Sequence, residues 1–370
     1  MSTRTYRRIA ILLSGLLGGG LLVAPQATAA TPAVSCPATA AMQAADAYWV
    51  ANGTDMTSND WQNATFHVGN LAMVRTTGVS NHKTLPWAEA NNYQLADQPN
   101  GPYFPDYFAA GEAYLALQYF HPSQASLAPL ESRVAAVVTN VQNGHFRYWD
   151  YVDALNMAMP SFAQLGVRDN SQADLTAMHT LFEYTKSGVG GRGLFDQRTG
   201  LWWRDANYIG SHTFWSRGNG WAFAALAKVL TALPASDPHR AEYLQVFRRM
   251  AQTLVHVQRR DGFWNVDLLN PFDHPGPESS GTALFTYGLA WGVDNGVLPA
   301  GLYTPAIQRA WSALTTRALQ PSGLLGYVQG VAHSPSGAQP VTATSTAAYG
   351  VGVFLLAGQQ VAALTPECAA

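Results

Sequence analysis

Helix-like segments recur along most of the chain, and this recurrence limits the fold more than any other feature. Glycine and proline clusters separate the segments, for example GVGGRG at 188–193 and PGP at 275–277. Strand-like alternation is scarce, although the piece Leu201–Arg204 fits a small hairpin. The predicted helices cover 37–51, 65–77, 81–95, 106–120, 124–140, 151–166, 171–187, 218–233, 238–258, 280–296, 304–318 and 342–363.

A dozen helices without a visible linker can form an open solenoid or a closed ring of helix pairs. Solenoids normally show a sequence repeat of fixed period, and this chain shows none. The segments Trp221–Leu233 and Thr282–Trp291 are apolar nearly all round, which is typical of helices surrounded by other helices. We therefore predict an all-α fold, a closed (α/α)6 barrel of six helix pairs, formed by one domain over residues 31–370.

The first thirty residues have the pattern of a signal peptide. Three arginines within the first eight residues precede an apolar run and then a stretch of small residues. We expect cleavage near Ala29 or Ala30 and export of the protein, either secreted or periplasmic. The Arg7–Arg8 pair is a weak match to a twin-arginine signal. No later apolar run is long enough to span a bilayer, so we expect no membrane association of the mature chain.

Charge and aromatic content narrow the class of ligand. The net charge is −2 and only 12% of residues are charged, and the absence of a basic stripe argues against a nucleic-acid partner. Aromatic residues reach 11%, with 11 tryptophans, which suits stacking against sugar rings, although core filling also explains many tryptophans. The composition does not indicate an oligomeric state, and we expect a monomer.

Two cysteines lie just inside the two ends of the mature chain. In an exported protein Cys36 and Cys368 are expected to pair as a disulfide, and two free thiols are the less favoured alternative. Neither the cysteines nor the histidines have the spacing of a zinc site, so no metal is predicted.

Two aspartates precede apolar helices in similar surroundings. Asp153 lies beside Trp149 and several methionines, and Asp106 lies among aromatic residues. Each can be a helix N-cap, and residue types alone favour that interpretation for Asp153. Alternatively, an apolar surround raises the pKa of a carboxyl and keeps it protonated as a general acid. Glycoside chemistry usually needs two carboxyl groups around one bond, which these two could supply.

The stretch WSRGNGW, residues 215–221, places an arginine among glycines and indoles. Its glycines predict a turn before a helix, with Asn219 as a local cap. The Arg217 guanidinium suits bidentate binding of a carboxylate, so an anionic substrate is a natural hypothesis. A structural ion pair with an acidic residue is the alternative. Glu278, before Ser-Ser-Gly, is a weaker candidate as a supporting residue.

Four segments together resemble the unsaturated glycuronyl hydrolases of glycoside hydrolase families 88 and 105, and the family-105 type, the unsaturated rhamnogalacturonyl hydrolases, is the closer. They are NDWQNATFHVG, DALNMAMPSFAQLG, WSRGNGW and ESSGTALFTYGLAWG, and the resemblance runs from about Trp49 to Tyr349. It implies an (α/α)6 barrel that removes the unsaturated (C4=C5) uronic acid from the non-reducing end of oligosaccharides left by polysaccharide lyases. In this reaction an aspartic acid protonates C4, water adds at C5, and the resulting hemiketal opens. The resemblance implies no metal or organic cofactor.

The same resemblance assigns roles to single residues. Asp153 falls on the catalytic aspartate, and Asp106 falls on the first of two paired acids, the second being replaced by Tyr107. Arg204 stands where the family has a histidine, and Ala64 replaces a glycine after the aromatic platform. His145 is near, but out of register with, another family histidine. The substrate-binding residues predicted in this way, or from their position beside Asp153, are Trp61, Trp149, Arg204, Trp215, Arg217 and Trp221.

The resulting hypothesis is a glycosidase acting on unsaturated uronides, with rhamnogalacturonan disaccharides as the expected substrates. A conventional glycosidase or a polysaccharide lyase on the same barrel is the alternative, followed by a non-catalytic sugar-binding protein. The choice between a galacturonyl and a glucuronyl substrate, and the identity of the second sugar, stay open.

Overall fold

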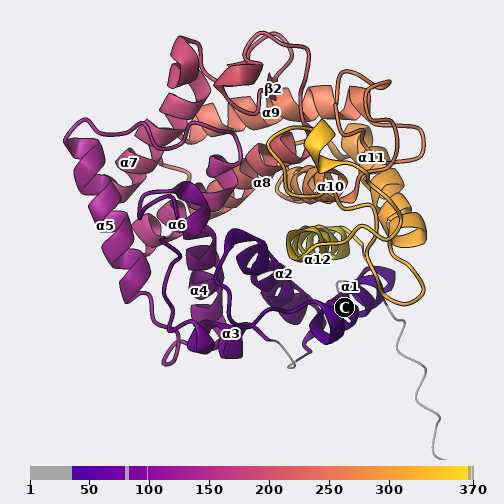
Figure 1. Cartoon of the computed structure of the whole chain (residues 1–370), viewed down its shortest axis with the longest axis horizontal. Coiled ribbons are helices and arrows are strands. Elements are labelled where there is room, and N and C mark those ends of the chain that lie inside the picture. The colour runs from indigo at the N-terminus through magenta and orange to yellow at the C-terminus, as the bar shows by residue number, and fades with distance from the viewer. Residues whose placement is uncertain (1–35, 80–82, 98, 366–367, 369–370) are drawn as a thin grey trace, which may run out of the picture. The chain divides into compact units, whose positions relative to one another are not determined.

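In the part of the chain that the structure describes, twelve α-helices form two concentric rings, as predicted (Figure 1). The computed structural model describes residues 36–79, 83–97, 99–365 and 368, and the described residues from Cys36 onward group into one compact unit. The predicted signal peptide, residues 1–30, lies outside the described residues. The inner ring consists of α2 (Trp61–Thr77), α4 (Ala109–Phe120), α6 (Ala154–Arg168), α8 (Ser216–Ala232), α10 (Ser279–Asp294) and α12 (Ala348–Ala363).

The outer helices alternate with the inner ones along the chain. They are α1 (Pro37–Asn52), α3 (Thr84–Ala90), α5 (Ala128–Gln142), α7 (Gln172–Glu183), α9 (Arg240–Val257) and α11 (Ala300–Ala313). Each inner helix packs against the inner helix before it and the one after it, and α12 packs against α2, so the ring is closed. The predicted (α/α)6 barrel is therefore confirmed.

Burial follows the two rings. All residues from Ser216 to Leu230 of α8 are buried, because other helices surround it. In contrast, α9 buries one stripe only, at Tyr243, Val246, Phe247, Met250, Ala251 and Leu254, which recur every three or four residues.

Small residues allow the ring to close between its first and last inner helices. A Cβ atom added at Gly69 of α2 would lie 2.2 Å from the carbonyl oxygen of Gly352 in α12. One added at Gly352 would lie 2.3 Å from the carbonyl oxygen of Thr65. Neither position can carry a side chain at this helix separation, so glycine sets how closely α2 and α12 approach.

Several helix starts differ from prediction, and at α2 capping rather than apolar periodicity decides the start. Helix α2 begins four residues earlier than expected, because the Asp60 carboxylate accepts hydrogen bonds from the N–H groups of Gln62 (2.8 Å) and Asn63 (2.9 Å). Helix α8 begins at Ser216, so the predicted turn in WSRGNGW is wrong and its glycines lie inside a helix.

Three further features complete the fold. The predicted hairpin is present as β1 (Phe195–Asp196) paired antiparallel with β2 (Leu201–Trp202). Cys36 and Cys368, the two cysteines paired in the sequence analysis, form a disulfide with Cα atoms 4.9 Å apart. Within the described residues, no helix has the length and apolar character needed to cross a membrane.

Candidate active site

The predicted site residues lie at the N-terminal ends of the inner helices. Trp61 is the first residue of α2, Asp106 lies in the 3-10 turn η1 (Pro105–Phe108) before α4, Asp153 directly precedes α6, and Trp215 directly precedes α8. Contacts between these residues, given below, show that the N-terminal ends meet. Helix N-termini carry partial positive charge and unpaired N–H groups, so this end of the barrel favours an anionic ligand.

Asp153 occupies the N-cap position of α6 but does not cap it. Its side chain makes no capping hydrogen bond, so the cap interpretation is wrong, and its backbone hydrogen bond is to its own N–H group. Burial raises the pKa of Asp153, while the charges of Arg204 and Arg217 act to lower it. The carboxyl therefore stays protonated to a higher pH than an ordinary aspartate, as a proton donor requires.

Asp106 is held beside Asp153 by a tyrosine that sequence reasoning did not assign. The Tyr151 hydroxyl donates a 2.6 Å hydrogen bond to Asp106 Oδ1. Burial raises the pKa of Asp106 to about 7, against the lowering effect of this hydrogen bond, and the charge of Asp153 adds to the rise. The two carboxyl groups therefore share one electrostatic environment, as the sequence analysis expected of a pair.

Arg217 is anchored by neutral oxygens. Its Nη1 donates to the carbonyl oxygens of Gln329 (3.3 Å) and Gly330 (2.8 Å) and to the Tyr349 hydroxyl (3.0 Å). Within the described residues no carboxylate forms an ion pair with Arg217, so the structural ion-pair interpretation is wrong. Its positive charge is not neutralised by a bonded partner, and it lies 4.7 Å from the centre of the Trp215 ring.

An aromatic cluster stands next to this guanidinium. The Trp61 ring lies 5.0 Å from that of Tyr349 and 6.3 Å, edge-on, from that of Trp221. The cluster joins the N-terminal ends of α2, α8 and α12, so the predicted Trp61 and Trp221 do come together. Tyr349 was not predicted. It is an aromatic residue at the start of the last inner helix, and its position beside Trp61 follows from closure of the ring, which the local sequence does not show.

A buried network fixes the start of α8. The Trp215 indole N–H donates to Gln329 Oε1, and Gln329 Nε2 donates to Ser216 Oγ (3.1 Å). Ser216 Oγ in turn donates to Glu278 Oε2 (3.3 Å). Glu278 itself caps α10, since its carboxylate accepts the N–H groups of Ser280 and Gly281, and it is fully buried. Glu278 thus supports the site without being exposed to it.

The contacts of Asn219 and Gly218 within the fold explain why these residue types occur at these positions. The Asn219 side chain accepts from Trp202 N (2.8 Å) and donates to Trp202 O (2.9 Å), so it ties β2 to α8 and does not cap the helix as predicted. A Cβ atom added at Gly218 would lie 2.8 Å from Val152 Cγ1 and 3.5 Å from Asp153 Oδ1. A glycine at 218 therefore leaves space for the Val152 and Asp153 side chains.

The remaining predicted residues are placed as follows. Arg204 binds the Asp205 carboxylate and lies 3.3 Å from His333 Nδ1, and its guanidinium is 5.9 Å from the centre of the Tyr151 ring, so it belongs to the site. Trp149 is 1% exposed and packs edge-on against Phe162, which places it in the core. His145 is exposed.

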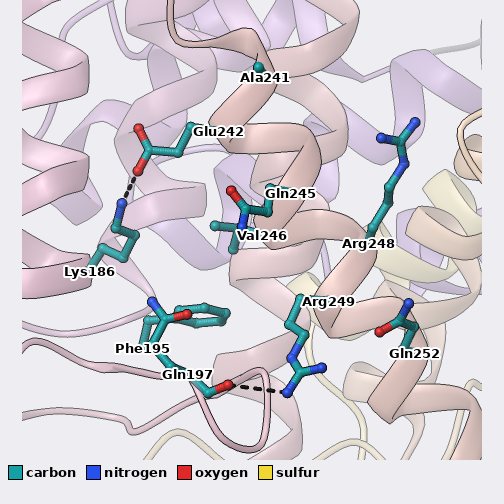
Figure 2. A pocket seen from close by; sticks show the side chains of 10 residues that line it. All are labelled: Lys186, Phe195, Gln197, Ala241, Glu242, Gln245, Val246, Arg248, Arg249 and Gln252. Atoms are coloured by element: carbon teal, nitrogen blue, oxygen red, sulfur yellow. Dashed lines mark hydrogen bonds and ion pairs between the residues drawn. The ribbon is translucent and has the colours of Figure 1, made fainter.

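Two hollows differ in their relation to these residues. A cavity of 310 Å³ is lined by Gln62, Gln329 and Tyr349 together with the segment 328–347, and so adjoins the candidate site. A groove of 530 Å³ runs along the outer helix α9 (Figure 2) and contains none of the predicted site residues.

Comparison with known proteins identifies the family to which the chain is similar. The model of Glycosyl Hydrolase Family 88 matches residues 37–365. The chain is 30% identical over 332 residues, covering 81% of it and 76% of the relative, to an unsaturated 3S-rhamnoglycuronyl hydrolase of Alteromonas sp. (strain LOR). A solved family-88 glycosyl hydrolase of Bacteroides vulgatus superposes with a TM-score of 0.81 at 32% identity, covering 88% of this chain and 97% of that one. Another solved structure, named a polysaccharide lyase, superposes with a TM-score of 0.80 at 32% identity, covering 88% and 96% of the two chains.

Proposed function

This chain belongs to glycosyl hydrolase family 88, and we propose that this glycosidase releases an unsaturated (C4=C5) uronic acid from the non-reducing end of lyase-generated oligosaccharides. The observation that carries the proposal is Asp153, a carboxyl with a raised pKa and no capping hydrogen bond, near Arg217, which has no ion-pair partner among the described residues. The name of the Alteromonas relative suggests that rhamnose follows the uronate.

The chemistry assigned to Asp153 is protonation of an alkene carbon. The carboxyl proton adds to C4, and the electron pair of the C4=C5 bond forms the new C4–H bond. Water then bonds to C5 and returns a proton to the carboxylate. The C5 hemiketal opens by breaking the bond from C5 to the ring oxygen, and C1 becomes a hemiacetal that releases the second sugar. Asp106, coupled to Asp153, is the helper carboxyl.

The rest of the site supports binding of a uronate. The carboxylate of the substrate is assigned to Arg217 and to the helix N-terminal ends around it, since a guanidinium can donate two parallel hydrogen bonds to a carboxylate. The sugar ring is assigned to Trp61, the partly exposed member of the aromatic cluster, with the buried Trp221 and Tyr349 packed against it. Arg204 reaches the same end of the barrel beside Tyr151 and is assigned to the substrate as well.

The test is loss of the ultraviolet absorbance of the conjugated alkene carboxylate. A panel should pair unsaturated glucuronyl and galacturonyl residues with rhamnose and with other second sugars. Asp153→Asn is expected to lower kcat/KM by roughly 10²–10⁴-fold, the usual contribution of a general acid. The matched control is Asp150→Asn, three residues earlier on the surface, which is expected to keep the rate within about threefold. Wild-type absorbance loss in Asp153→Asn would overturn the assignment.

The polysaccharide lyase alternative has one observation in its favour, the name of a solved structure at 32% identity. A lyase creates the double bond and a hydrolase of this kind destroys it. The two therefore change the absorbance in opposite directions, on intact polysaccharide and on unsaturated oligosaccharide respectively. Binding of the whole panel without any change in absorbance would indicate the non-catalytic sugar-binding alternative.

Export is proposed on separate grounds. The basic and apolar pattern of residues 1–30 and the disulfide between Cys36 and Cys368 both fit an oxidising compartment. N-terminal sequencing of the protein recovered outside the cytoplasm is expected to begin just after Ala29 or Ala30, and an intact Met1 would contradict the proposal.

A further inference from the structure

Two histidines and a glutamate from different outer helices come together away from the proposed active site. His179 lies near the end of α7, whereas His239 and Glu242 lie at the start of α9. Their ligand atoms all lie within 4.8 Å of one another, and the three side chains are partly buried. Within the described part of the chain, this is the one group of three or more histidine, cysteine or acidic residues that lies so close together.

The orientation of His179 is fixed from its far side. Its Nδ1 lies 3.2 Å from the hydroxyl of Tyr243, which is fully buried, and its Nε2 lies 3.7 Å from Glu242 Oε2. Metal-binding histidines commonly use their second ring nitrogen in such a bond, which sets the ring orientation. The rings of His179 and His239 stack at a centroid distance of 3.4 Å and an angle of 15°.

Glu242 is held in the same way through its other oxygen. Its Oε1 binds the Lys186 ammonium at the edge of the groove along α9 (Figure 2). The same ammonium lies 2.5 Å from Glu183 Oε1. This leaves Oε2 on the side of His179. Each carboxylate oxygen therefore has its own partner, and the arrangement does not depend on an ion pair between His179 and Glu242.

We propose that His179, His239 and Glu242 bind one divalent first-row transition ion, with Zn²⁺ as the best match, and thereby join α7 to α9. Two imidazole nitrogens and one carboxylate oxygen form a common zinc ligand set, and water completes the four ligands. Ligand atoms around a tetrahedral zinc ion lie roughly 3.4 Å apart, from bond lengths of about 2.0–2.1 Å. The group must therefore contract by on the order of 1 Å. Because an imidazole nitrogen binds a metal in the plane of its ring, the His239 ring must also turn out of its parallel stack with His179.

The sequence alone could not indicate this site. His239 and Glu242 have the i, i+3 spacing of one helix face, but His179 is 60 residues earlier (239 minus 179) and is brought close only by the packing around Tyr243. The site lies on outer helices, whereas the proposed catalytic residues lie at the ends of inner helices. The proposed ion site is therefore independent of the proposed function.

The experiment uses the full mature chain without a histidine tag, stripped with a chelator and dialysed. Titration calorimetry with Zn²⁺ is expected to show one ion per chain, and the thermal unfolding temperature is expected to rise when Zn²⁺ is present. Co²⁺ is expected to give the intense visible absorption bands of a tetrahedral ion. Affinity for Zn²⁺ is expected to fall at least tenfold in His239→Ala, while hydrolysis of unsaturated uronides stays at the wild-type rate.

Two controls make the result decisive. His256→Ala removes an exposed histidine of the same helix, whose Nδ1 lies 2.6 Å from Gln252 O, and is expected to bind Zn²⁺ as the wild type does. Lys186→Met removes the competing cation from Glu242 and is expected to tighten binding. The proposal is overturned if no saturable binding of one ion per chain is seen, or if His239→Ala binds as tightly as the wild type.

Discussion

Gly218→Ala is the substitution that most directly links packing to the proposed chemistry. Position 218 lies in α8, where alanine is favoured over glycine by about 0.8–1.0 kcal/mol in a helix interior. Against this, the new Cβ would lie 2.8 Å from Val152 Cγ1, whereas ordinary contacts lie at 3.4–4 Å. Val152 is fully buried and β-branched, so its side chain cannot simply rotate away.

The required displacement can be read from those distances. Moving from 2.8 Å to between 3.4 and 4 Å shifts Val152 by 0.6–1.2 Å, and Asp153 is its chain neighbour. Overpacking of this kind costs about 1–3 kcal/mol, so the net loss of unfolding free energy is about 0–2 kcal/mol. A misplacement of about 1 Å in a catalytic group costs on the order of 10²-fold in rate. We therefore expect roughly a ten- to hundredfold fall in kcat, with a loss of unfolding free energy of no more than about 2 kcal/mol.

The assay is loss of substrate absorbance, run in parallel with thermal unfolding. Gly301→Ala is the matched control, because Gly301 lies in α11 with no atom within 4 Å of an added Cβ. It is expected to leave kcat unchanged and to raise the unfolding free energy by up to about 1 kcal/mol. If Gly218→Ala retains wild-type kcat, the argument that glycine makes room for Asp153 is refuted.

Three further predictions concern charge and covalent closure. The pKa of Asp106, about 7, exceeds its unfolded value of about 3.9, so this carboxyl lowers folding stability as the pH rises between those values. Tyr151→Phe removes the hydrogen bond that lowers the pKa of Asp106, so this pKa is expected to rise. The upper end of the pH range over which stability falls, and the part of the kcat/KM profile that reports Asp106, are then expected to move to higher pH. An unmoved profile would contradict the assignment. Lys228→Met leaves the buried Glu112 without its 2.9 Å partner and is expected to cost about 3–5 kcal/mol in denaturant unfolding, less if Glu112 becomes protonated. Cys36→Ser removes the disulfide and is expected to have an unfolding free energy about 2–5 kcal/mol below that of the oxidised wild type. The reduced wild type serves as the comparison. Equal stability of the oxidised wild type and the variant would argue against this contribution.

The sequence was most informative where a single helix face carries the signal. Turn signals between helix-like segments located the twelve described helices, and apolar periodicity marks outer helices such as α9, which bury one stripe only. It was less informative at helix starts. Asp60 extends α2 by four residues through two side-chain hydrogen bonds, which periodicity does not register.

The candidate site was predicted only in part, because contacts that the local sequence does not show decide the roles of several of its residues. Residue types favoured a cap for Asp153, since the N-cap position suits both a cap and a free acid, and only the missing hydrogen bond separates them. The glycines of WSRGNGW indicated a turn because glycine disfavours helices, yet here close helix contacts require it. Gln329 and Tyr151 gave no local signal, since their partners lie far away in the sequence.

The contact between α2 and α12 has a consequence for synthesis of the protein. Trp61 and Tyr349 share one aromatic cluster although 288 residues separate them (349 minus 61). A nascent chain that has not yet released α12 lacks Tyr349, the hydroxyl that helps hold Arg217, and the helix that joins the two ends of the ring. Catalytic competence therefore arrives in a single step at the end of translation, and a truncated chain is expected to be inactive however much of the barrel it contains.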